Sequence, residues 1–159
     1  MSEATHEKKC SSWNLSFAHF ILRTWVGIRL FMAGLDKFRA GDGENVSFSL
    51  ENYAVKSDRI AKLMADNSLI PAALCGPYAH GIGYALLIVG AWTLIGLFTE
   101  LSLFAGGLLF LSLGFGLSAL PDDMELTANI GVCILITAAA LATSKNRKLS
   151  LDGLFFRKG

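Results

Sequence analysis

The feature that most constrains this chain is a series of long apolar stretches. Residues 13–35, 78–98, 101–120 and 126–143 are each predominantly apolar, and the third stretch contains no charged side chain. An α-helix needs about 20 such residues to cross the ~30 Å hydrocarbon core of a bilayer. We therefore predict an all-α integral membrane protein, in which four transmembrane helices pack as a four-helix bundle within one domain, residues 1–159.

The composition agrees with a membrane protein and excludes one class of partner. Hydrophobic residues make up 53 % of the chain and charged residues 17 %, whereas a soluble domain carries about a quarter charged residues. The net charge of +1 lacks the basic excess that nucleic-acid binding requires, so we expect no nucleic-acid partner.

The distribution of basic residues predicts the orientation. They cluster in the two tails, at Lys8, Lys9, Lys145, Arg147, Lys148, Arg157 and Lys158, while the connection 121–125 holds three acids and no base. Basic flanks remain in the cytoplasm, so both termini are predicted to be cytoplasmic. The polar, weakly basic start does not resemble a signal peptide, and we expect the first span to be retained.

Residues 41–70 form the one sizeable segment expected outside the membrane. The segment opens with the turn sequence GDGEN, and Ile60, Leu63 and Met64 then recur at helical spacing among charged residues. This pattern predicts a short amphipathic helix that lies on the mouth of the bundle or in the membrane interface. The segment is alternatively a polar connector that packs on the bundle only for stability.

Two arginines interrupt the first span. Arg23 lies near the cytoplasmic end, where we expect it to extend towards lipid phosphates or to pair with Glu100. Arg29 lies ~24 Å along the helix from Trp13, beyond the midplane of the core. Asp36 shares its helix face, but helical side chains lean towards the N-terminus and Arg29 therefore points away from it. Backbone carbonyls, a lipid, a small molecule and another subunit all remain possible partners for Arg29.

The histidines and cysteines do not form a redox or metal motif. His19 and His80 belong to opposite ends of neighbouring spans, about 20 Å apart or more, so one haem iron cannot bind both. Each is expected to form hydrogen bonds at an interface. The cysteines at 10, 75 and 133 lack the spacing of a zinc site or a paired thiol relay.

Small residues recur along the spans. Gly83 and Gly90 are seven residues apart, as are Gly107 and Gly114. Small residues at this spacing allow membrane helices to approach closely, so we expect these glycines at helix contacts.

The run LRTWVGIRLFMAGLDKFRAG (22–41) resembles the first-helix signature of DoxX-type membrane proteins. The matching positions are Arg23, Gly27, Phe31, Gly34, Leu35 and Lys37. Residues 85–109 are similar to the second and third helices of that family, including Gly90 and Gly96. The chain departs at Leu86, where many members have an acid, and at Glu100, where they often have an arginine.

The resemblance implies a four-helix bundle in the bacterial cytoplasmic membrane, close to quinone-linked redox chemistry. We expect a non-catalytic accessory subunit of a larger membrane redox complex, with lipids and other membrane subunits as partners. The alternative is a quinone-binding subunit of a thiosulfate:quinone-type oxidoreductase. No metal or covalent cofactor is expected, and a quinone or a lipid is the candidate bound molecule. The candidate contact residues are Arg29, Arg23, Asp36, Lys37, His19 and His80, and the candidate packing residues are Gly27, Gly34, Gly83, Gly90, Gly96, Gly107 and Gly114.

Overall fold

The computed structural model describes the backbone of residues 2–41, 45–67, 70–118, 126–146 and 149–151. Side chains are described from residue 13 onward, except those at 67, 117–118, 126–127 and 146. The acidic connection 121–125 and the basic residues at 8, 9, 147, 148, 157 and 158 therefore lie outside the described side chains. The described part of the chain is mostly helical, as predicted, and its remaining regular structure is a small two-stranded hairpin.

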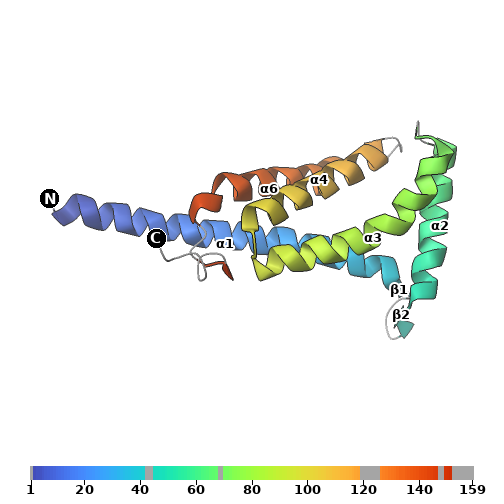
Figure 1. Ribbon diagram of the computed structural model, residues 1–159, viewed down its shortest axis with the longest axis horizontal. Coiled ribbons are helices and arrows are strands. Elements are labelled where there is room, and N and C mark those ends of the chain that lie inside the picture. Colours follow the sequence, from blue (N-terminus) through green and yellow to red (C-terminus); the bar gives the residue numbers. More distant parts are fainter. Residues whose placement is uncertain (1, 42–44, 68–69, 119–125, 147–148, 152–159) are drawn as a thin grey trace.

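Four helical elements run along the long axis of the molecule (Figure 1). They are α1 (Ser2–Phe38), α3 (Ala72–Ile95), α4 (Thr99–Ser118) and α6 (Val132–Ala142). Neighbours pack in the order α1, α3, α4, α6 and back to α1, and α1 also contacts α4 across the bundle. The N-terminal part of α1 projects beyond this bundle, so the helix continues through the polar residues before the predicted span.

Three helices among the described residues are long and apolar enough to cross a membrane. They comprise Trp13–Phe38, Ala72–Ile95 and Thr99–Gly116. The region predicted as the fourth span consists of a π-helical turn, η2 (Leu126–Gly131), followed directly by α6. Its apolar helical part is the shorter stretch Ala128–Ala142, so length and composition establish three candidate spans.

The boundary between the second and third spans differs from the sequence-based expectation. Helix α3 ends at Ile95 because Gly96 adopts a left-handed conformation, with φ 75°, and its N–H bonds to the carbonyl of Trp92. Glycine enters this conformation without the steric penalty of a Cβ. Thr99 and Glu100, which separate the predicted spans 78–98 and 101–120, instead form the first turn of α4.

Segment 41–70 folds across one end of the bundle. Strands β1 (Arg39–Ala40) and β2 (Ser47–Phe48) pair antiparallel, and α2 (Leu50–Asn67) then crosses the ends of α1 and α3 (Figure 1). The predicted amphipathic helix is present, and its covered face includes two of the three predicted apolar positions, since Met64 is buried and Ile60 half-buried. Tyr53, Ser57 and Met64 are buried, while Leu63 is 47 % exposed.

Aromatic rings and polar contacts attach α2 to the bundle. The Tyr53 ring stacks on Phe38 with centroids 4.4 Å apart, and its hydroxyl donates to the carbonyl of His80 at 2.6 Å. At the other side of α2, the Asp58 carboxylate lies 3.0 Å from Nε2 of His80. These contacts favour the interpretation of the segment as a structural connector that packs on the bundle.

The core lies where the four long elements meet. It contains Val26, Leu30, Ile82, Leu86, Leu103, Phe110, Cys133 and Ala140. These apolar side chains pack closely between the helices, and buried polar side chains, among them His19 and Arg23, lie in the same interior.

Candidate membrane-embedded interaction site

The contact between α1 and α3 depends on glycines from both helices. A Cβ on Gly27 would lie 2.7 Å from the Leu94 side chain, and a Cβ on Gly34 would lie 2.8 Å from Leu87. On α3, a Cβ on Gly90 would meet the backbone of Phe31 at 2.5 Å. Successive contacts run in opposite chain directions, so the helices are antiparallel and touch backbone to backbone.

The remaining candidate packing glycines lie at other contacts. Gly83 faces the ring of Tyr53, Gly96 faces the guanidinium of Arg23, and Gly107 is 3.5 Å from the methyl of Thr137 when a Cβ is placed on it. Gly114 is half-buried in α4. Substitution by a larger residue at Gly83 or Gly96 would therefore displace α2 or the Arg23 side chain.

Arg23 is buried inside the bundle, with 3 % of its surface exposed. Its guanidinium donates to the carbonyls of Thr93 and Leu94 at 3.1 and 3.3 Å and to the carbonyl of Leu149 at 3.4 Å. The last carbonyls of a helix receive no hydrogen bond from an N–H of the same helix, and they carry the negative end of the helix dipole. Both properties favour a cationic donor at the end of α3. The expectation that Arg23 extends to lipid phosphates is therefore wrong.

The alternative partner expected for Arg23 was Glu100. Both side chains are described, and no ion pair joins them; the Glu100 carboxylate instead accepts a hydrogen bond from the hydroxyl of Ser144 at 3.3 Å. Arg23 has a structural role: it ties the C-terminal end of α3 to α1 and to the segment that follows α6.

His19 lies one turn before Arg23 on the same face of α1. The ring is 2 % exposed, and Nδ1 donates to the carbonyl of Ala140 at 3.1 Å. His80 lies at the opposite end of the bundle, beside Asp58 of α2. The two histidines thus belong to separate structural contacts, and each bonds across an interface between helices.

Asp36 and Lys37 end α1 at the side covered by α2. The ammonium of Lys56 donates to the backbone carbonyl of Asp36 at 2.6 Å and lies 3.6 Å from its carboxylate. Lys37 is half-buried in the last turn. Asp36 is therefore paired with α2, and not with Arg29.

Arg29 lies on the outer surface of α1. Its side chain is exposed, and it makes no hydrogen bond or ion pair with any described residue. Backbone carbonyls of its own bundle, one of the partners left open by the sequence, do not bind it.

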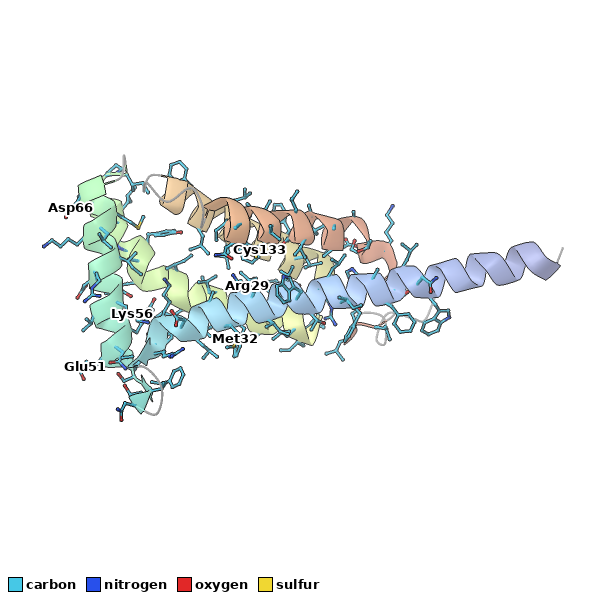
Figure 2. The ribbon with its side chains drawn as sticks, turned by 180° about the vertical axis from the view of Figure 1, so that it is seen from behind. Arg29, Met32, Glu51, Lys56, Asp66 and Cys133 are labelled. Atoms are coloured by element: carbon cyan, nitrogen blue, oxygen red, sulfur yellow. The ribbon has the colours of Figure 1, made fainter. Side chains whose placement is uncertain are left out.

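The neighbouring helices define how deep Arg29 lies. The next residue, Leu30, packs 3.0 Å from the position that a Cβ on Gly106 would take. Gly106 lies seven residues after Thr99 and ten before Gly116, the ends of the apolar stretch in α4. At ~1.5 Å per residue, these distances are about 10 and 15 Å. Figure 2 accordingly shows Arg29 about midway along the part of α1 that the other helices accompany.

The environment of Arg29 on that surface is apolar. Trp25, Ile28 and Met32, which are four residues before, one before and three after it, are 48, 44 and 56 % exposed. We call Trp25, Ile28, Arg29 and Met32 the α1 ridge. An uncompensated arginine near the bilayer centre costs about 2.5–3.5 kcal/mol on insertion scales. The ridge residues other than Arg29 were not singled out from the sequence, although helical spacing around Arg29 would have found them.

A pocket of about 320 Å³ lies beyond the ridge, where α1 meets the β1–β2 hairpin. Its lining is Met32, Leu35, Asp36, Arg39, Val46 and Phe48. The pocket is mainly apolar, with two charged residues among those that line it. This size falls within the range of small-molecule sites.

Metal chemistry has no candidate ligand set in the described residues, because no group of three or more histidine, cysteine, aspartate or glutamate side chains gathers there. Cys75 and Cys133 are both buried free thiols. No protein-family model matches the chain, and no curated protein or solved structure shows detectable similarity to it. The fold and the site thus define a helical protein with membrane-spanning character and one exposed mid-depth arginine.

Proposed function

We propose that this chain is a small accessory subunit of a larger membrane redox complex linked to quinone, and that it has no catalytic activity of its own. The single observation that carries the assembly part of the proposal is Arg29, an exposed arginine at mid-depth with no bond to a described residue. A contact outside the chain offsets the cost of such a charge. The redox part rests on the resemblance of residues 22–41 and 85–109 to DoxX-type proteins.

The proposal includes four spans and cytoplasmic termini in the inner membrane of a bacterium. Packing of η2 and α6 against α4, and of α6 against α1, supports α6 as a fourth, short membrane-embedded helix. A labelling experiment tests the orientation in a variant in which Cys10 is replaced by serine. Ser47 and Lys145 are both exposed at the protein surface, so the side of the membrane decides which of them the reagent reaches. A membrane-impermeant maleimide should label Ser47→Cys from outside and should not label Lys145→Cys. The reverse pattern would overturn the orientation.

Purification from native membranes in a mild detergent tests the assembly. We expect a second membrane protein in fixed stoichiometry, accompanied by a flavin, haem or iron–sulfur absorbance that the purified chain lacks. The chain expressed by itself should not reduce a soluble quinone with thiosulfate or sulfide as the electron donor. Turnover by the isolated chain would overturn the accessory role.

A second candidate function, quinone binding by the chain itself, is favoured by the pocket at the end of α1. An apolar pocket with charged groups among its lining residues suits a quinone head group, which is flat, apolar and able to accept hydrogen bonds. A photoreactive quinone analogue should label the peptide that contains Val46 and Phe48, and Val46→Trp should abolish the labelling by filling the pocket. Labelling that persists in this variant would exclude the pocket as the quinone site.

A further inference from the structure

The other exposed helix faces of the bundle provide the reference for the α1 ridge. On α4, the large exposed side chains are Leu101, Phe104, Leu108, Leu111 and Phe115, and on α6 they are Val132 and Leu135. These faces suit contact with lipid chains and place no charge at mid-depth. Within the described residues of the spans, Arg29 is the exposed cation between the ends of the bundle. The ridge therefore differs in chemistry from the described outward faces of α4 and α6.

The composition of the ridge is typical of a protein contact. Tryptophan, arginine and methionine are enriched in interfaces, and tryptophan and arginine dominate their energetic centres. Trp25 and Met32 flank Arg29 at helical spacing, four residues before and three after. A partner helix on this ridge would cover the guanidinium from both sides with apolar surface and exclude lipid and water from it.

A second copy of this chain does not supply what Arg29 needs. Two copies share one orientation in a membrane, so a symmetric contact between α1 ridges brings the two guanidinium groups to the same depth. Among the residues that the structure describes, the acids nearest in the bundle lie at its ends. Asp36 pairs with Lys56, and Glu100 bonds to Ser144. Neither lies at the level of Arg29, so self-association would juxtapose like charges in a medium that screens them poorly.

We infer that the α1 ridge docks a transmembrane helix of a second, different protein, and that this helix carries an aspartate or glutamate at the depth of Arg29. The inference rests on the proposed accessory role and adds the surface and the chemistry of the partner. A carboxylate is the complement that the planar guanidinium binds with two parallel hydrogen bonds. In a low-dielectric setting this pair is strong enough to select one register between the two helices.

Photo-cross-linking in native membranes tests the surface. A p-benzoylphenylalanine is placed in full-length chains in place of Trp25 or Met32, and, as matched controls on other helices, in place of Ile88 or Phe104, which are 66 and 55 % exposed. We expect the two ridge positions, and neither control, to cross-link to one other membrane protein. Mass spectrometry should map the cross-link to within one helical turn of an Asp or Glu inside an apolar span.

Charge exchange tests the chemistry. Arg29→Leu should lower the cross-linking yield from position 32 at least tenfold, and Arg29→Lys should lower it less, because lysine keeps the charge but loses the fork of donors. Arg29→Glu should abolish the cross-link, and replacing the mapped acid of the partner with arginine should restore it. Each variant is first checked for membrane insertion, and Arg29→Leu, which adds no charge to the bilayer, serves where Arg29→Glu does not insert.

The outcomes separate this inference from the proposed function. A partner that co-purifies but cross-links only from position 88 or 104 leaves the accessory role standing and overturns the ridge. A ridge cross-link to lipid, to a second copy of the chain or to a span without an acid overturns the inference as well, as does an unchanged yield in Arg29→Leu. If no protein co-purifies and none of the four positions cross-links to a protein, both the accessory role and the ridge inference are overturned.

Discussion

Arg23 and Arg29 are two arginines on one helix whose surroundings differ completely. Arg23 is 3 % exposed and donates to three backbone carbonyls, whereas Arg29 is exposed and bonds to no described residue. The inner face of α1, with His19, Arg23 and the glycines, holds the helix against α3 and α6. The side chains of the α1 ridge lie on the outer surface of the bundle, and Arg29 among them forms no bond to a described residue. An arginine within a span can therefore stabilise the fold or remain available to a partner. It stabilises the fold where backbone carbonyls lie within reach of its guanidinium.

The largest expected effect is that of Arg23→Leu. Removal of the guanidinium leaves the carbonyls of Thr93, Leu94 and Leu149 without this donor inside the protein. Hydrogen bonds to charged groups contribute about 1.5–3 kcal/mol each, and relief of the cost of burying the charge offsets part of their sum, so we expect a net loss of about 3 kcal/mol in the free energy of unfolding. Titration with SDS in mixed micelles, followed by circular dichroism, measures it. A variant as stable as the parent protein would show that Arg23 does not stabilise the fold, and the contrast with Arg29 would be lost.

Gly90→Ala should be the next most damaging substitution. The added methyl meets the Phe31 backbone at 2.5 Å, which cannot move away without separating α1 from α3. Overpacking of this kind costs typically 1–3 kcal/mol, and we expect about 2 kcal/mol in the same titration. Gly81→Ala on the same helix is the control, because nothing lies within 4 Å of its added methyl. An equal loss of stability in the two variants would contradict the close contact between α1 and α3 at Gly90.

His19→Leu should cost less than either, about 1 kcal/mol, the value of one hydrogen bond. The loss is limited because the carbonyl of Ala140 keeps a second donor, the hydroxyl of Thr143 at 3.1 Å. The double variant His19→Leu, Thr143→Val removes both donors and should cost more than the sum of the single changes. Strict additivity of the two would show that the carbonyl is not shared in this way.

The smallest effect on stability is expected for Arg29→Leu. No bond within the described chain is lost, and a lipid-exposed charge is removed, so the free energy of unfolding of the isolated chain should stay unchanged or rise by a few tenths of a kcal/mol. The same SDS titration checks it, with Arg23→Leu as the contrasting variant. Destabilisation by more than about 1 kcal/mol would show that Arg29 supports the fold and would remove the difference between the two faces.

Much of this architecture could be predicted from the amino-acid sequence. The apolar stretches indicate membrane-spanning helices, because each is long enough to cross the bilayer as a helix, whose internal hydrogen bonds satisfy the backbone in lipid. The faces of α1 are also implied, since Arg23, Gly27, Leu30 and Gly34 follow helical spacing and six residues place Arg29 about 120° from Arg23. Read together with the glycines, this spacing would have assigned Arg23 to the packed face.

Other features were decided only by the tertiary structure. The acceptors of Arg23 come from the end of α3 and from Leu149, far along the chain, and local sequence carries no information on which carbonyls will meet there. The burial of Tyr53 on α2 likewise depends on the rings of Phe38 and Tyr84 that it contacts, which belong to other helices. Sequence periodicity determines which residues share a helix face, whereas the packing of distant helices determines which face is buried and at what depth a charge lies. Burial against the end of α3 is what distinguishes Arg23 from Arg29.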